Sequence, residues 1–158
     1  GEVSVVAPPP ADGELRRAGA AVVDRGRYYV VAADPDASPG GERQALFAYE
    51  EGQAEPVFVE PLPSPAAGAT PGLDGAGNIF VVTDDGVLMS WTFDGELRFL
   101  RALAVQPGAL ERAAVAVTAD NTSLVVGDGR VFGVQADANQ STSAWFRPRR
   151  DNFSTGHR

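Results

Sequence analysis

The chain of 158 residues contains no cysteine and no lysine, and it has one histidine and one methionine. The absence of cysteine excludes disulfide bonds, thiolate metal sites and a cysteine nucleophile. All thirteen basic residues are arginines, which we interpret as the mark of a bacterial source with a GC-rich genome. The one histidine, His157, is the penultimate residue, where the buried and oriented imidazole of a Ser-His-Asp relay is not expected.

Positive charge and long apolar runs are also scarce. The formal net charge is −8 at pH 7, which argues against binding to nucleic-acid backbones or to anionic membrane surfaces. No apolar run approaches the roughly 20 residues that a membrane-spanning helix needs. The hydrophobic fraction of 44% is nevertheless that of a globular protein, and 158 residues suffice for one substantial core. We therefore expect no nucleic-acid partner and no membrane span.

What the chain does have is a strand-turn-strand pattern that recurs three times. A repeat spaced by a few tens of residues indicates a propeller, a solenoid or an array. The sequence Asp12-Gly-Glu-Leu15 also echoes Asp94-Gly-Glu-Leu97, at a distance of two repeats of about 41 residues each. The first strands of the pattern are 27–32, 78–83 and 123–127, and the second strands are 45–49, 87–91 and 130–134.

Each repeat reads as four strands separated by turns. In the middle copy, a short lead-in precedes the continuous apolar strand Ile79–Thr83, Val87–Phe93 returns, and 96–103 forms an outer strand. The other two copies place their outer strands at 56–62 and 142–146. Asp-Gly pairs, which favour tight hairpins, separate the strands. Because no helical period of useful length occurs, we predict an all-β fold made of four-stranded antiparallel blades.

Two details predict how these strands pack. In the outer strand of the middle copy, Leu97 and Phe99 alternate with Arg98 and Leu100, as in a half-exposed edge strand. A second detail concerns one repeat-equivalent position in the third strand of each unit. Small residues there predict a crowded contact between adjacent sheets, although chance in a composition rich in small residues is the alternative. These residues are Ala48, Ser90 and Gly133.

The repeats divide the chain into units. We predict that residues 1–148 form a partial β-propeller, an incomplete ring within this chain, followed by a C-terminal tail at 149–158. The amino-terminal unit is half a blade because only its last part matches the repeat. The predicted units are a half blade at 1–18 and whole blades at 19–64, 65–107 and 108–148.

At this level of detail the repeats resemble a known family. Thr70-Pro71, the Asp74–Asn78 turn, the strand Ile79–Thr83 and Leu88–Trp91 resemble the repeat of quinoprotein-like β-propellers, also called pyrroloquinoline-quinone-like repeats. The tail segment from Trp145 to Gly156 resembles a segment that flanks many such propellers, with Phe146 where proline is usual. The resemblance implies a closed ring of about six to eight blades.

An incomplete ring implies partners, because an open stack of blades leaves two apolar faces uncovered. The missing blades would belong to another protein chain, to a longer precursor or to a second copy of this chain. Non-enzymatic relatives of the resembled family are scaffolds of the bacterial envelope. The leading hypothesis is therefore a non-catalytic scaffold or protein-interaction module of an exported bacterial assembly, located in the periplasm or at the cell surface.

The alternative hypothesis is a fragment of a propeller enzyme, or of a small-ligand-binding propeller whose site lies on missing blades. Enzymes of the resembled family have a vicinal cysteine pair, a bound calcium ion and an aspartate base. This chain has no cysteine, and a shared fold does not imply a shared function. A third, weaker hypothesis is a carbohydrate- or surface-adhesion module, against which the aromatic content of 8% argues.

Several segments were candidates for chemistry. Asp34–Glu42 spaces its oxygen ligands as a calcium loop does, but Pro39 and Ala45 replace the glycine and the acid that an EF-hand requires, which favours a polar hairpin loop. Gly75-Ala-Gly77 is glycine-rich but precedes no predicted helix, so a phosphate cradle is not expected. The only basic cluster, Arg147, Arg149 and Arg150, is either a contact for an acidic surface or a solvated tail.

The remaining candidates for a functional role are the aspartates in the turns and the two tryptophans. Aspartates in one set of turns would form an acidic rim for a basic protein or a cation, but the turns of the opposite end are equally acidic, so turn chemistry explains both sets. Trp91 and Trp145 are interpreted as packing residues between blades. We assign no catalytic, cofactor-binding or metal-binding residue and expect no cofactor. The rim aspartates are Asp34, Asp36, Asp84, Asp85 and Asp128, and those of the opposite end are Asp24, Asp74, Asp94, Asp120 and Asp137.

Overall fold

A computed structural model of the chain describes residues 21–34, 43–68, 70–105, 110, 113–117, 122–127 and 129–135. These residues contain eleven β-strands and no helix, which confirms the predicted all-β class. No helix long and apolar enough to cross a membrane occurs among them. The predicted half blade at 1–18, the outer strand at 142–146 and the tail lie outside the described residues.

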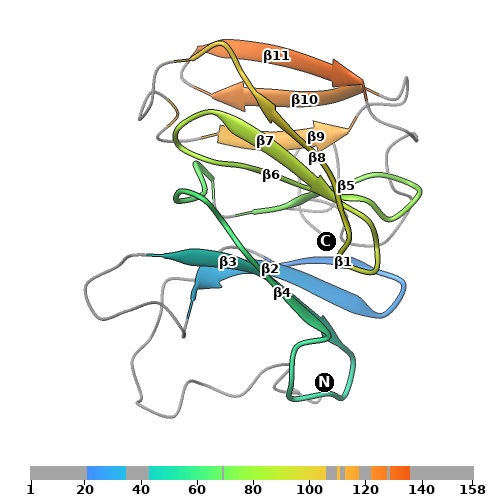
Figure 1. Cartoon of the computed structure of the whole chain (residues 1–158). Coiled ribbons are helices and arrows are strands. Elements are labelled where there is room, and N and C mark those ends of the chain that lie inside the picture. Colours follow the sequence, from blue (N-terminus) through green and yellow to red (C-terminus); the bar gives the residue numbers. More distant parts are fainter. Residues whose placement is uncertain are drawn as a thin grey trace, which may run out of the picture.

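The strands form three antiparallel sheets, each built from consecutive strands (Figure 1). The first sheet contains β1 (Val22–Asp24), β2 (Arg27–Ala33), β3 (Gln44–Glu50) and β4 (Phe58–Pro61) in that order. The second contains β5 (Gly72–Leu73), β6 (Ile79–Val82), β7 (Val87–Trp91) and β8 (Leu97–Ala102). In the third, β9 (Ala113–Val117), β10 (Thr122–Gly127) and β11 (Arg130–Gln135) follow one another. The predicted four-stranded units are thus observed in full in the first two sheets.

The sheets stack face to face in chain order, with the second sheet in the middle (Figure 1). One apolar core lies between the first and second sheets and includes Tyr29, Leu46 and Trp91. A separate core lies between the second and third sheets and includes Phe80 and Val125. We call the face of each sheet that points toward the next sheet its forward face, and the opposite one its rear face.

The second sheet is covered on both faces, as its sequence predicted. All four residues of β6 are at most 2% exposed, and their side chains alternate between the two cores. A strand of this kind needs apolar residues at every position, because each successive side chain enters one core or the other. Trp91 is also fully buried and belongs to the core between the first and second sheets, in agreement with its predicted packing role.

The predicted alternation of the outer strand β8 is wrong. Leu97 pairs with Trp91 and Phe99 pairs with Ser90, so three residues of β8 oppose two residues of β7 and the strand contains a bulge. The extra residue reverses the alternation, so that Leu97 shares a face with Leu100 rather than with Phe99. Both leucines point to the rear face at the sheet edge and are 54% and 52% exposed, whereas Phe99 packs on the forward side against the other core.

The small residue in the third strand of each repeat was predicted to lie in a crowded contact between sheets. This residue is buried in two of the three sheets. Ala48 and Ser90 lie on forward faces and are completely buried. Gly133, at the same position of the third sheet, is exposed. The close contact predicted for this position therefore exists wherever the described structure includes a following sheet.

Gly95, in the turn between β7 and β8, lies close to the first sheet. Its substitution therefore tests how the first two sheets pack. Its φ of +92° lies in the left-handed region, and a Cβ there would lie 2.8 Å from the Phe58 ring of β4. Gly52 has a similar φ of +80° but open space around it. We expect Gly52→Ala to cost about 1–2 kcal/mol of unfolding free energy, from backbone strain alone. Gly95→Ala should cost about 2–5 kcal/mol, because Phe58 must also move.

Equilibrium denaturation of both variants measures this difference. Equal losses for the two substitutions would contradict the close approach of the β7–β8 turn to the first sheet.

Candidate functional site

Most segments that the sequence singled out lie outside the described residues. This applies to His157, to the arginine cluster at 147–150, to Trp145, and to Asp36, Asp120, Asp128 and Asp137. The candidate calcium loop Asp34–Glu42 is described only at Asp34. This residue is buried, and its backbone N–H donates to the Arg43 carbonyl over 2.8 Å. The glycine-rich segment Gly75–Gly77 is a turn between β5 and β6, so no helix follows it, as expected.

Asp74 and its turn illustrate what the described aspartates do. The buried Asp74 carboxylate accepts hydrogen bonds from the backbone N–H groups of Ala76 and Asn78 over 3.0 and 2.9 Å. Its second oxygen accepts from the Asn78 amide over 2.7 Å. Both oxygens are therefore committed to closing the turn, an Asx arrangement that explains the aspartate without a ligand.

Asp85 has a comparable role in the β6–β7 turn. It accepts a short hydrogen bond from the hydroxyl of the buried Thr83. Although burial acts to raise it, the pKa of the Asp85 carboxyl is held below its ordinary value, because the hydroxyl and backbone N–H groups donate to its ionised form. The described aspartates thus support the explanation of the acidic turns by turn chemistry.

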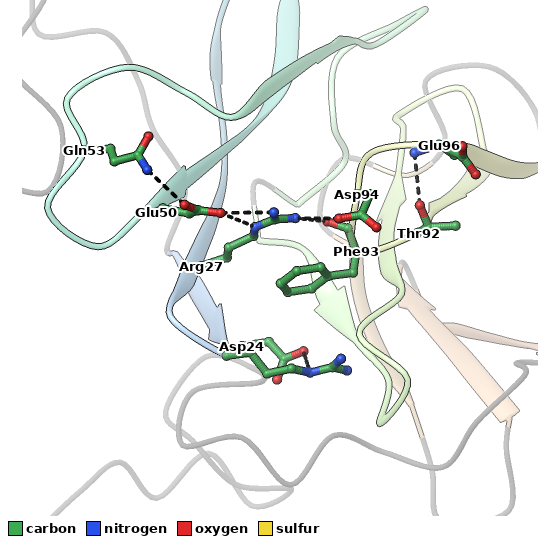
Figure 2. Close-up of polar contacts among 9 residues, drawn as sticks. Asp24, Arg27, Glu50, Gln53, Thr92, Phe93, Asp94 and Glu96 are labelled. Carbon is green, nitrogen blue, oxygen red and sulfur yellow. Dashed lines mark hydrogen bonds and ion pairs between the residues drawn. The ribbon is translucent and has the colours of Figure 1, made fainter.

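The most organised polar group is a set of four residues, the Arg27 cluster, which consists of Arg27, Glu50, Phe93 and Asp94. The Arg27 guanidinium pairs with Glu50 through Nε and Nη2, at 3.1 and 3.0 Å, and both residues belong to the first sheet. Its Nη1 donates to the Phe93 carbonyl over 2.6 Å and to Asp94 over 3.2 Å, in the β7–β8 turn of the second sheet. Figure 2 shows the guanidinium between these two groups. One side chain therefore ties the two sheets together.

Aromatic contacts reinforce the Arg27 cluster. The Arg27 Cζ lies 3.9 Å from the centroid of the Phe93 ring, and the Cζ of the neighbouring Arg25 lies 5.2 Å from it. Phe93 in turn meets Tyr29 edge-on at 6.4 Å between centroids. A guanidinium over an aromatic face is stabilising, and more so when it is shielded from water. The Arg27 side chain is only 12% exposed, so this contact is a substantial one.

The protonation states of Arg27 and of the neighbouring Tyr29 do not change near neutral pH. Burial acts to lower the pKa of Arg27, but its hydrogen bonds to Glu50 and Asp94 hold it above its ordinary value. Burial also raises the pKa of the Tyr29 phenol far above its ordinary value. Arg27 therefore stays protonated, and the neighbouring Tyr29 stays neutral, at neutral pH. We therefore interpret the cluster as a structural connection between sheets.

Two buried polar atoms beside this region, the Tyr29 hydroxyl and the Trp91 indole N–H, have no hydrogen-bond partner among the residues that the structure describes. Both side chains belong to the core between the first and second sheets. An unsatisfied buried group costs about 1–3 kcal/mol, which the large apolar area of the two rings offsets.

Across the described segments, no group of three His, Cys, Asp or Glu side chains is placed to hold a metal ion. The sequence did not indicate the Arg27 cluster, because Arg27 is more than sixty residues from Phe93 and Asp94, and these two residues belong to a different repeat.

Comparison with family models, with curated proteins and with solved structures found no match for the chain. The candidate site is therefore interpreted from its own geometry.

The inter-sheet role of Arg27 predicts a graded loss of stability. Arg27→Ala removes hydrogen bonds of a charged donor and should lower the unfolding free energy by about 2–3 kcal/mol. Arg27→Lys should lie between this variant and the wild type, since lysine keeps the charge but not the planar fork. Arg101→Ala is the matched control, because Arg101 is an exposed arginine of β8 and an exposed charged side chain contributes about 0–1 kcal/mol. Urea denaturation distinguishes them, and equal losses for Arg101 and Arg27 would contradict the assigned role.

The Asp85–Thr83 contact predicts a specific acid sensitivity. A carboxyl whose pKa is lowered by folding contributes stability above its unfolded pKa of about 3.9, and this contribution is lost as the pH falls through the folded pKa. Thr83→Val removes the donor, so its stability should fall less between neutral pH and the acid range than that of the wild type. Thr83→Ser keeps the hydroxyl and should keep the wild-type profile. Thermal melts over this pH range test both, and identical profiles for Val and Ser would exclude the effect.

Proposed function

We propose that the three sheets are consecutive blades of an incomplete β-propeller, and that the chain is a non-catalytic scaffold that other blades complete. The way the first strands of the sheets meet supports the propeller arrangement. β1 lies beside β5, and β5 and β6 lie beside β9. At Gly72 in β5, a Cβ would lie only 3.0 Å from the Val115 carbonyl of β9. Sheets that approach most closely along their first strands are arranged like blades around an axis.

One observation supports the role as an interaction module most directly. Leu46, Leu88 and Val131 occupy the same position of the three repeats, on the forward face of the third strand. The following sheet covers Leu46 and Leu88 completely, so both are 0% exposed. Val131 belongs to the third sheet and is 64% exposed. Since the repeat places an apolar residue there for burial by a neighbour, its exposure indicates a missing neighbour.

The rear face of the first sheet is more covered than the forward face of the third sheet. Val81 and Val125 are repeat-equivalent residues on rear faces and are fully buried. Their equivalent in the first sheet, Val30, is only half-buried, and so is Tyr28 beside it. On the same face, Phe47 and Ala45 are 6% and 0% exposed, so the open end of the described stack is the forward face of the third sheet. The exported bacterial location inferred from the family resemblance belongs to the same proposal.

Substitution of Val131 tests this function in the cells that produce the protein. The wild-type chain should be recovered in a complex of greater mass than the chain alone, as measured by native mass spectrometry. Val131→Arg should reduce the recovered complex by about ten-fold or more, because an unpaired charge is not tolerated in an apolar interface. Leu97→Arg is the matched control, since Leu97 is similarly exposed but lies on neither end face. Recovery of the wild type as a lone chain would exclude the scaffold role.

A further inference from the structure

We propose that Asp94 is a site of spontaneous isomerisation to isoaspartate, and that this modification loosens the contact between the first and second sheets. The reaction favours an aspartate that precedes a glycine, because glycine has no side chain to hinder attack by its backbone nitrogen. Three such pairs lie among the residues that the structure describes, and their carboxyl groups are held very differently. They are Asp74-Gly75, Asp85-Gly86 and Asp94-Gly95. The modification does not depend on the proposed scaffold function.

The reaction forms and breaks bonds of the turn backbone itself. The Gly95 nitrogen attacks the carboxyl carbon of the Asp94 side chain, a C–N bond forms, and a carboxyl OH group leaves with the amide proton as water. The product is a cyclic succinimide. Water then adds to the backbone carbonyl carbon of the ring, the bond from this carbon to the Gly95 nitrogen breaks, and the chain continues through the side chain as isoaspartate. No atom is oxidised or reduced, and water is the only reactant.

Asp74 is the best protected of the three carboxylates. Its oxygens accept hydrogen bonds from the Ala76 and Asn78 backbones and from the Asn78 amide, and the side chain is buried. Attack requires the carboxyl group to rotate out of these contacts. Each hydrogen bond to a charged group that must break slows the reaction by about ten-fold or more. Isomerisation at Asp74 should therefore be at least about 100-fold slower than in an unconstrained turn.

Asp85 is protected by hydrogen bonding and by charge. The hydroxyl of the buried Thr83 donates to its carboxylate, and this bond must break before the Gly86 nitrogen can attack. The hydrogen bonds also hold the pKa of the Asp85 carboxyl below its ordinary value. A lower pKa reduces the fraction of the neutral acid, the form from which oxygen leaves more readily as water. Asp85 should therefore react more slowly than an exposed aspartate.

Asp94 is held much less firmly. Its side chain is 78% exposed, and its carboxylate contacts Arg27 Nη1 at 3.2 Å. An exposed ion pair of this kind restrains a side chain little. The attacking nitrogens of Gly86 and Gly95 each donate a turn hydrogen bond over 3.0 Å, so the carboxyl group decides the difference between these two pairs. The geometry therefore points to Asp94 as the most reactive of the three aspartates.

The position of Asp94 in the β7–β8 turn gives the modification its consequence. Isoaspartate adds the side-chain methylene to the main chain, so the turn becomes longer. The Phe93 carbonyl of this turn accepts a hydrogen bond from Arg27 over 2.6 Å. Gly95 lies so close to the first sheet that a Cβ would be 2.8 Å from the Phe58 ring. A longer turn cannot keep both of these close contacts, so the modified chain loses part of the connection between the sheets.

Incubation of the purified full chain at neutral pH and physiological temperature tests the proposal. Mass spectrometry with electron-transfer fragmentation distinguishes isoaspartate from aspartate at each position. We expect isoaspartate to accumulate at Asp94 about ten-fold faster than at Asp85 and about 100-fold faster than at Asp74. The urea midpoint of the aged chain should shift toward that of Arg27→Ala. Asp94→Glu is the matched control, because it keeps the charge but disfavours the cyclic intermediate, so its midpoint should not shift.

Variants of Thr83 test the protective role of the hydrogen bonds. Thr83→Val removes the donor to Asp85, so isoaspartate should form at Asp85 about ten-fold faster than in the wild type. Thr83→Ser keeps the hydroxyl and should keep the slow rate. Equal rates at Asp85 in the two variants would contradict this explanation of the difference between the aspartates.

Two further results would overturn the assignment. The first is isoaspartate that forms at Asp94 no faster than at Asp85 in the wild-type chain. The second is an Asp94→Glu chain whose urea midpoint falls on ageing as far as that of the wild type, since the loss of stability would then arise elsewhere in the chain.

Discussion

Burial of sheet faces is the constraint on which the rest of this structure depends. A four-stranded sheet has two faces, and it buries an apolar face only against another layer. β6 illustrates the consequence, because its four consecutive apolar residues are stable only with a sheet on each side. The second sheet therefore cannot exist without the first and the third. The same requirement makes the forward face of the third sheet, where Val131 is 64% exposed, the least satisfied face of the described structure.

The described polar contacts support that packing. Arg27 bridges the first sheet and the β7–β8 turn, and its guanidinium covers the Phe93 ring at the rim of the apolar core. The Asp74 turn joins β5 to β6, and the Asp85 turn joins β6 to β7. By fixing where these strands reverse, the turns set the register and hence the face on which each side chain lies. The bulge in β8, opposite Ser90 and Trp91, shows that register determines which face a side chain occupies. Its one extra residue places Leu97 on the other face of the sheet.

The strands and turns could be predicted from the sequence, because strands and Asp-Gly turns are determined by residues that are close together in the chain. The strands and the order of the two complete sheets were predicted correctly, and so was the burial of β6 and Trp91. The bulge in β8 was missed because it depends on pairing with β7, and alternation alone cannot reveal it. The Arg27 cluster was missed because its partners come from different repeats. Gly133 was expected to be crowded, yet crowding requires a neighbouring sheet that the sequence pattern of one unit does not contain.

The energetics of the open end face set what a partner must supply. Docking any rigid partner costs about 4–15 kcal/mol of translational and rotational freedom. Complete burial of one valine or aromatic side chain contributes only about 1.5–3 kcal/mol, so burial of Val131 alone cannot offset that cost. A partner in the proposed scaffold must therefore bury more of the third sheet than this one residue, as the second sheet buries Leu46 together with Tyr29 and Val31.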